Sequence, residues 1–190
     1  MPRPRDRSRT DATGRAYAGS QRQIQTYVNE RTAELSQAIA EAIPPSTIDP
    51  QEIHWVSPLK ADKYSEYQDR EFLEIIGAAH LAPMLSEFWP KRGPCWDALA
   101  LLRGGGCVLV EAKSHVSEVY GRGCFASGRS RFLICSSLAR AKSWMGVKPE
   151  TDWMGSLYQS ANRLAHLYFL REIGKVWESP GISGQRIFHR

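Results

Sequence analysis

Two acidic residues and one lysine stand on either side of a glycine-rich turn in the middle of the chain. Asp97 precedes a short apolar run, and Glu111 and Lys113 follow a second one. The runs are separated by Arg-Gly-Gly-Gly at 103–106, a pattern that predicts a β-hairpin. The open end of this hairpin would carry three charged side chains next to strands that are otherwise apolar.

The expected register of the hairpin brings these charges together. If Leu102 pairs with Gly106 across the turn, stepping outward along both strands places Asp97 opposite Glu111. Alternate residues of a strand share a face, so Lys113 lies on the same side as Glu111. Like charges that face each other across a strand pair are destabilising, and a divalent cation between the carboxylates removes that cost.

Such a group of side chains supports metal-dependent hydrolysis. Mg²⁺ takes hard oxygen ligands, commonly one or two carboxylates together with water and substrate phosphate. A lysine beside the ion, here Lys113, can hold or deprotonate a bound water for attack on phosphorus. The alternative is an ordinary hairpin with charged residues at its solvated end, which is the usual explanation of a lone Glu-x-Lys strand.

Asp97, the glycine turn and Glu111-Ala112-Lys113 resemble the motif of the PD-(D/E)XK nuclease superfamily, with Pro94 three residues before the aspartate. The resemblance implies an α/β fold of the restriction-endonuclease-like type, in which helices flank a small mixed sheet. It implies that Asp97, Glu111 and the Ala112 carbonyl bind Mg²⁺, or Mn²⁺ in its place. Lys113 would lie beside the attacking water. The implied activity is that of an endonuclease, with DNA favoured over RNA as substrate.

In this superfamily an acidic residue on the first core helix often reaches the metal site. The apolar spacing of residues 63–80 predicts that helix here. Asp69 lies at the margin of its apolar face and is the expected additional metal ligand. Glu66 and Glu71 are the alternatives, and a solvated helix flank explains all three without a function.

A further helix is predicted over residues 152–172, where apolar residues recur at helical spacing. Gln159, Asn162 and Arg163 lie near one another on it, at intervals of three and four residues. The resemblance implies that polar residues at this place contact the scissile phosphate as part of substrate binding. A solvated helix face is the alternative.

Ser114 and His115 follow the second hairpin strand directly and are also candidates for substrate binding. A polar, glycine-rich loop comes next, at 117–130, and its arginines are suited to phosphate contact. Long loops beside a site are often functional. A helix is predicted after it, from about 130 to 145.

The chain is expected to divide into three parts. Residues 1–20 are arginine-rich and polar and predict a disordered basic arm. Residues 21–45 predict one amphipathic helix that packs on the domain or on a second copy of it, as in a homodimer. Residues 46–190 form the nuclease-like α/β domain, with a short strand at 53–56. Its sheet is expected to be incomplete, because only 186–189 offers a last strand.

Composition and charge indicate which classes of binding partner to expect. The net charge of +5 and a sequence pI near 9.1 suit a polyanion such as nucleic acid. No apolar run is long enough to span a bilayer and no signal peptide is recognised, so no membrane partner is expected. The four cysteines lack metal-ligand spacing and favour a reducing cytoplasm.

Two other functions stay open at this point. One is a non-catalytic nucleic-acid-binding domain that keeps a relic of the site. The other is an interaction or scaffold protein that uses the N-terminal helix, residues 21–45, as its contact surface.

Overall fold

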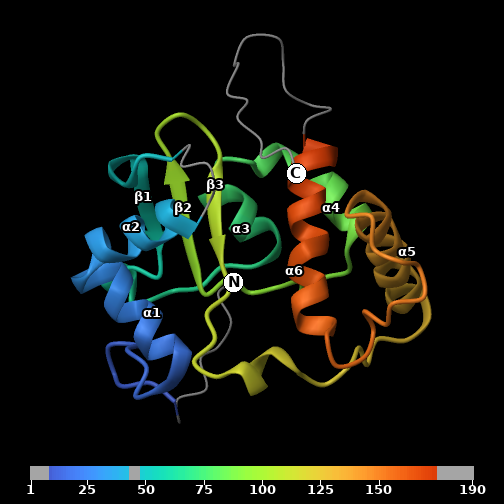
Figure 1. The fold of residues 1–190 in the computed structure, drawn as a ribbon, viewed down its shortest axis with the longest axis horizontal. Helices are drawn as coiled ribbons and strands as arrows, with labels where there is room; N and C mark the ends of the chain where they lie inside the picture. Colours follow the sequence, from blue (N-terminus) through green and yellow to red (C-terminus); the bar gives the residue numbers. More distant parts are fainter. Residues whose placement is uncertain (1–8, 43–47, 175–190) are drawn as a thin grey trace.

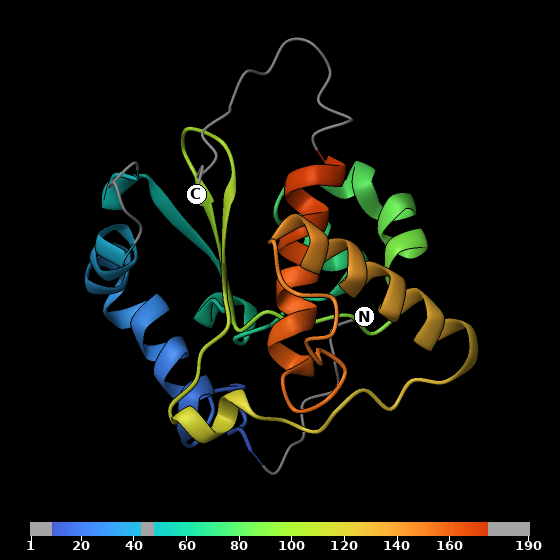
Figure 2. The ribbon, with the colours of Figure 1, turned by 45° about the vertical axis from the view of Figure 1, so that its right-hand side comes forward.

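The computed structural model of the protein describes residues 9–42 and 48–174. Over these residues the chain is an α/β fold in which a small sheet lies between two groups of helices (Figures 1 and 2). On one side of the sheet lie α1 (Gly19–Glu30) and α2 (Thr32–Ala42). On the other side lie α3 (Asp69–Ile75), α4 (Ala82–Phe88), α5 (Gly128–Trp144) and α6 (Tyr158–Tyr168). The α/β class predicted from the sequence is confirmed.

Short helical turns join these elements. Four of them are 3₁₀ turns: η1 (Pro50–Glu52), η2 (Lys60–Asp62), η3 (Ala79–Leu81) and η4 (Val116–Val119). The fifth, η5 (Phe169–Ile173), is a π-helical turn that continues α6.

Within the described residues the sheet has three strands in the order β1–β2–β3, and neighbouring strands are antiparallel. They are β1 (Ile53–Ser57), β2 (Ala98–Leu102) and β3 (Cys107–Val110). The strand predicted at 53–56 is thus confirmed as β1, and the helix predicted at about 130–145 is confirmed as α5. β2 is the central strand.

The predicted hairpin and its register are confirmed. Ala98 pairs with Val110, and the Leu102 N–H donates to the Gly106 carbonyl at 3.1 Å across the turn. Gly105 and Gly106 have φ angles of 91° and 94°, a left-handed backbone that glycine adopts without steric cost. The glycines of the turn therefore fix the register on which the site depends.

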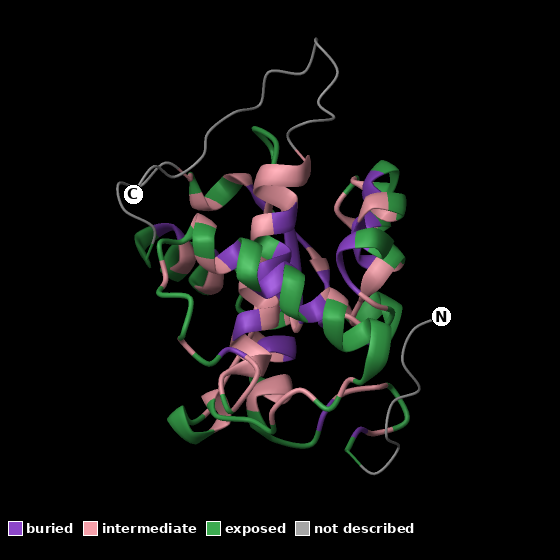
Figure 3. Ribbon diagram, turned by 90° about the vertical axis from the view of Figure 1, so that its right-hand side faces the viewer, coloured by how far each residue is buried: buried purple, intermediate pink, exposed green. Residues whose placement is uncertain are grey.

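β2 buries both of its faces. Leu99 points into the larger core, which α3 to α6 share and which includes Phe72 and Phe169. Ala98 and Ala100 point the other way, into a smaller core with α1 and β1. Figure 3 shows buried residues along the inward sides of the helices and exposed residues on their outer sides. Because Leu99 points into the core that includes residues of α6, the odd-numbered positions of β2 face the layer that contains α6.

The N-terminal helix is broken in two, so the prediction of one helix over 21–45 is wrong. α1 ends at Glu30 and α2 begins at Thr32. The Thr32 hydroxyl donates to the Val28 carbonyl at 2.8 Å, and such local bonds compete with a regular helix and bend it.

Part of the predicted disordered arm is folded against α1. Residues 1–8 lie outside the described residues, but Thr10 and Ala16 pair through an isolated β-bridge. Ala16 is buried, and its N–H donates to the side-chain oxygen of Gln25 at 2.8 Å. The expectation of disorder therefore does not hold for residues 9–20.

The helix predicted over 63–80 begins later than expected. Lys63 and Tyr64 have left-handed backbone angles, with φ of 49° and 56°. Tyr67 then pairs with Trp96 in an antiparallel bridge, and the Trp96 N–H donates to the Tyr67 carbonyl at 3.1 Å. This tertiary pairing holds the segment extended and overrides its helical spacing, so α3 starts only after it.

The helix predicted over 152–172 also begins later, at Tyr158. The Asp152 carboxylate accepts the N–H groups of Met154 at 2.9 Å and Gly155 at 3.0 Å. An aspartate that bonds to the backbone two and three residues ahead favours a turn over a helix. The apolar residues before Tyr158 therefore lie in a loop.

The sheet of the described residues is antiparallel throughout, so the mixed sheet implied by the resemblance is not found there. The candidate last strand at 186–189 falls outside these residues. Within the same part of the chain, none of the helices has the length and apolar character needed to cross a bilayer.

Replacing Leu99 by alanine tests the larger core. Leu99 is fully buried, so Leu99→Ala is expected to lower the free energy of unfolding by about 2–5 kcal/mol, as measured by urea denaturation. Leu102→Ala is the control, because Leu102 is half-buried at the end of β2 and should lose less. Equal losses in the two variants would contradict the assignment of Leu99 to the core.

Candidate functional site

The open end of the β2–β3 hairpin carries the predicted acidic pair. Asp97 and Glu111 are the next residues outward from the Ala98–Val110 pair, and the Asp97 N–H donates to the Val110 carbonyl at 3.1 Å. The Asp97 carboxylate in turn accepts the Ala112 N–H at 2.8 Å. The backbone thus holds the Asp97 side chain across the end of the hairpin.

The environment of Asp97 disfavours the charged form of its carboxyl group. Burial raises its pKa from 3.8 to about 7, and the nearby carboxylate of Glu111 adds to the rise. Glu66 pushes the pKa in the same direction, whereas the Ala112 N–H and Lys113 oppose it. Near neutral pH this carboxyl group is therefore divided between its protonated and ionised forms, and added positive charge here favours the ionised form.

Glu111 is held by side chains from α6 and from the segment that follows β3. From α6, the Arg163 Nε donates to Glu111 Oε2 at 2.8 Å and the Gln159 Nε2 donates to Oε1 at 3.1 Å. The Lys113 ammonium forms an ion pair with Oε1. Glu111 and Arg163 expose 18 % and 15 % of their side chains, so this ion pair is largely shielded from water. The structure brings together Glu111, Lys113, Gln159 and Arg163, all predicted site residues.

Arg163 also braces the segment that leads into β2. Its Nη2 donates to the Cys95 carbonyl at 3.1 Å, and its guanidinium lies 5.7 Å from the centre of the Trp96 ring. Asn162, another predicted residue, accepts a 2.7 Å bond from Arg163 Nη1. Asn162 therefore orients the arginine. Among the described residues, its side chain makes no hydrogen bond to Asp97 or Glu111.

A third acid, Glu66, lines up with the hairpin pair. Because Tyr67 pairs with Trp96 in antiparallel fashion, the next residues outward are Glu66 and Asp97. The electrostatic effect of Glu66 on Asp97 agrees with this register. The three acids Glu66, Asp97 and Glu111 thus follow one another across adjacent extended segments, and we call them the carboxylate row.

Asp69, the acid chosen from the sequence, lies elsewhere. Its carboxylate accepts the N–H groups of Arg92 at 2.9 Å and of Gly93 at 2.8 Å, which anchors the approach to β2. Glu66, kept as an alternative, is the acid that joins the site. The sequence prediction chose the wrong acid because the backbone around Tyr67 is extended and not helical. This extended backbone places Glu66, and not Asp69, opposite Asp97.

Helix α1 contributes residues that the sequence did not point to. Gln21 donates to Glu66 Oε1 at 2.8 Å, and the Ser114 hydroxyl donates to Gln23 Oε1 at 3.3 Å. Ser114, a predicted substrate-binding residue, is thus tied to α1. His115 is exposed directly before η4. No local sequence signal links α1 to the hairpin, because this contact depends on tertiary packing.

His166 is a second buried titratable group on α6. Its Nδ1 donates to the Asn162 carbonyl at 2.8 Å, and its ring packs against Trp89 with centroids 5.0 Å apart. Burial lowers its pKa to about 4, so the ring is neutral at physiological pH. His166 is a packing residue behind the site.

The donor set fits a hard divalent cation. Asp97 and Glu111 supply carboxylate oxygens, and a cation between them would offset the repulsion by which Glu111 adds to the raised pKa of Asp97. Within residues 9–42 and 48–174, no three His, Cys, Asp or Glu side chains are grouped tightly enough to share one ion. Two carboxylates, with the implied Ala112 carbonyl, water and phosphate, would therefore make up the ligands.

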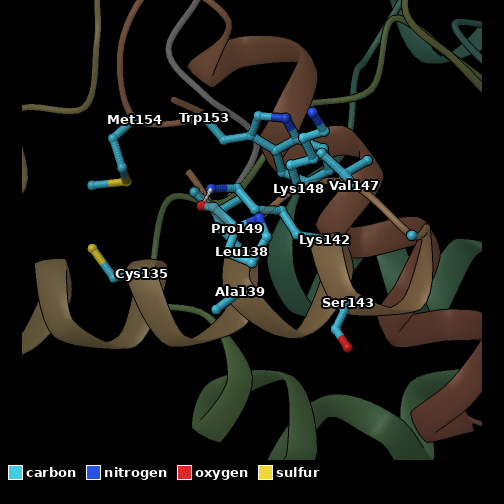
Figure 4. A pocket seen from close by; sticks show the side chains of 11 residues that line it. Cys135, Leu138, Ala139, Lys142, Ser143, Val147, Lys148, Pro149, Trp153 and Met154 are labelled. Atoms are coloured by element: carbon cyan, nitrogen blue, oxygen red, sulfur yellow. Dashed lines mark hydrogen bonds between the residues drawn. The ribbon is translucent and has the colours of Figure 1, made fainter. Parts of the chain in front are cut away.

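A pocket lies away from the carboxylate row, between α5 and the loop before α6 (Figure 4). Its volume is about 470 Å³, and Cys135 and Trp153 are among the residues that line it. The ammonium of Lys142, also in the lining, is engaged by the Pro149 carbonyl at 3.0 Å. The lining contains no Asp, Glu or His, so this pocket holds none of the carboxylate or imidazole ligands that a metal ion commonly takes.

Comparison with known proteins gives the chain no family. No protein-family model, curated protein or solved structure matches it. The resemblance to PD-(D/E)XK nucleases therefore stays a prediction carried by Asp97, Glu111 and Lys113.

The pKa of Asp97 predicts a specific dependence of stability on pH. The folded protein binds this proton more tightly than the unfolded chain, so the contribution of Asp97 is fully present below about pH 4 and is lost as pH rises to about 7. Asp97→Asn should therefore melt at a higher temperature than the wild type at about pH 8 and at a similar temperature at about pH 4. Thermal unfolding followed by circular dichroism in EDTA measures this. A constant offset between the two proteins at both pH values would contradict it.

Glu66 and Asp69 are expected to differ in role. Asp69→Ala leaves two backbone N–H groups without their acceptor and should lower the free energy of unfolding by about 1–3 kcal/mol, while Mn²⁺ binding is kept. Glu66→Gln should weaken Mn²⁺ binding and change stability little. Urea denaturation and calorimetric titration with Mn²⁺ separate the two effects. Loss of Mn²⁺ binding in Asp69→Ala, with binding kept in Glu66→Gln, would instead support Asp69 as the metal ligand.

Proposed function

We propose that the protein is a divalent-metal-dependent nuclease that hydrolyses phosphodiester bonds, with DNA favoured over RNA. The observation that carries the proposal is the meeting of Asp97, Glu111 and Lys113 at the open end of one hairpin. A like-charged pair of shielded carboxylates is costly for the fold, and a functional cation is a physical reason to keep it.

Each side chain has a role that follows from its contacts. Asp97 and Glu111 would hold Mg²⁺ or Mn²⁺, with Glu66 adding negative charge at the end of the carboxylate row. When bound, the ion would polarise a phosphoryl oxygen and stabilise the charge that develops on the leaving oxygen. Gln159 fixes the orientation of Glu111 through its 3.1 Å bond. Lys113, which is paired with Glu111, would hold the attacking water, and it would take a proton from that water only after losing its own.

Arg163 is the group best suited to the substrate phosphate. Its guanidinium already bonds to a carboxylate, and the same planar fork binds phosphate oxygens. A phosphate that displaces Glu111 from Arg163 would free that carboxylate for the cation. Substrate and metal would then bind in support of each other.

One observation favours a second function. The Glu111–Arg163 ion pair neutralises one of the two proposed metal ligands, as expected of a binding domain whose site is a relic. Such a domain would bind nucleic acid in a salt-dependent way without turnover in Mg²⁺ or Mn²⁺.

Cleavage assays decide between these functions. Labelled DNA and RNA incubated with the protein and Mn²⁺ should be cut, and Asp97→Asn, Glu111→Gln and Lys113→Met should each slow cleavage by about 100-fold or more. Lys148→Met is the matched control, because Lys148 is an exposed lysine that lines the pocket beside α5 and is not among the candidate site residues, and this variant should cleave as the wild type does. Tight binding without cleavage in either metal, or equal rates in all variants, would refute the nuclease.

A further inference from the structure

The segment from residue 114 to 132 exposes an unusual number of apolar side chains. Tyr120, Phe125 and Phe132 leave 62 %, 82 % and 75 % of their surface in contact with water, and Val116 leaves 81 %. A single exposed aromatic ring needs no explanation. Three rings and a valine are exposed along this one segment, and each would gain free energy if a partner covered it.

The charges of the same segment indicate what covers it. Arg122, Arg129 and Arg131 are exposed, and within the described residues no hydrogen bond or ion pair of their guanidinium groups is recorded. The single acid of the segment, Glu118, accepts a 3.4 Å bond from the Ser20 hydroxyl of α1. Free guanidinium groups between exposed rings are complementary to a partner with both phosphates and flat bases.

The segment is fixed in place although it lacks regular structure over most of its length. The Gly121 N–H donates to the Ser156 carbonyl at 2.9 Å, and the Cys124 N–H donates to the Met154 carbonyl at 2.8 Å. A Cβ at Gly123 would lie 2.8 Å from the same Met154 oxygen, closer than any side chain tolerates. These contacts hold the segment against the loop before α6, and Figures 1 and 2 show it passing the start of that helix.

The segment is also continuous with the candidate site. A Cβ at Gly121 would lie 3.8 Å from the side-chain oxygen of Gln159, whose nitrogen donates to Glu111. Tyr120 and Arg122 stand on either side of Gly121 in the chain. The exposed rings and guanidinium groups therefore begin beside a residue that touches the carboxylate row.

We propose that residues 114–132 bind the unpaired nucleotides of single-stranded nucleic acid and lead that strand to the carboxylate row. Bases would stack on Tyr120, Phe125 and Phe132, and phosphates would meet the three arginines. The inference rests on the proposed function, since it names the substrate class of the same site. Bases in a duplex are already stacked on each other, so single strands are bound more tightly than duplexes.

Fluorescence anisotropy in EDTA tests the proposal without any cleavage. The probes are labelled oligothymidylate and oligouridylate of about 20 nucleotides and a blunt DNA duplex of the same length. The protein should bind both single strands more tightly than the duplex, and Phe125→Ala should weaken single-strand binding by about 5-fold or more. Phe125→Tyr keeps the ring and should restore affinity, whereas Phe125→Leu keeps only the apolar volume and should not.

Met145→Ala is the control variant. Met145 is exposed at the other end of α5, about 20 Å along the helix from Phe132, and its loss should leave the affinity unchanged. Duplex bound as tightly as single strands, or equal affinity in the alanine and leucine variants and the wild type, would overturn the proposal. So would a concentration-dependent dimer that Phe125→Ala abolishes while the affinity for oligonucleotides is kept.

The two proposals fail separately. A protein that binds single strands through these rings but cuts neither DNA nor RNA in Mn²⁺ refutes the hydrolytic function and leaves the binding surface standing. If the protein cuts duplex DNA and its affinity for single strands does not change in Phe125→Ala, the binding surface is refuted and the hydrolytic function is kept.

Discussion

The ion pair between Glu111 and Arg163 joins the end of β3 to α6, and the arrangement of the site depends on it. Its partners are shielded from water, where an ion pair holds only if further hydrogen bonds satisfy both groups. That condition is met, because Glu111 also accepts from Gln159, and Arg163 also donates to the Cys95 carbonyl. The hairpin end, the approach to β2 and the first turns of α6 are thereby held together by one network.

The alternation of side chains along β2 explains why this network can form. Leu99 and its odd-numbered neighbours face α6, whereas Ala98 and Ala100 face the N-terminal helices. Asp97 belongs to the first set, so the apolar residue that anchors the strand and the acid of the candidate site share one face. A shift of one residue would turn the carboxylates away from Arg163.

Local patterns in the sequence predicted the centre of the site well. The hairpin could be read from two apolar runs around three glycines, and its register followed from counting outward from the turn. Gln159 and Arg163 could be grouped because helical spacing places residues four apart on one side. These predictions needed no knowledge of tertiary packing.

The errors arose where distant segments decide the local conformation. Tyr67 is held extended by Trp96, and this pairing exchanged Asp69 for Glu66 at the site. Asp152 holds a turn where apolar spacing predicted the start of α6. The part played by α1 was missed for the same reason, since nothing near Gln21 in the sequence signals a bond to a glutamate 45 residues away.

That bond to Glu66 changes how the chain can be divided. Helices α1 and α2 cover Ile53, Trp55 and the alanine face of β2, while Gln21 and Gln23 reach to the hairpin end. A fragment that starts at the first strand would expose this apolar face to water and release the outer acid of the row. The hairpin therefore cannot be transferred to another protein by itself, and grafting or trimming experiments must keep the N-terminal helices as one wall of the candidate site.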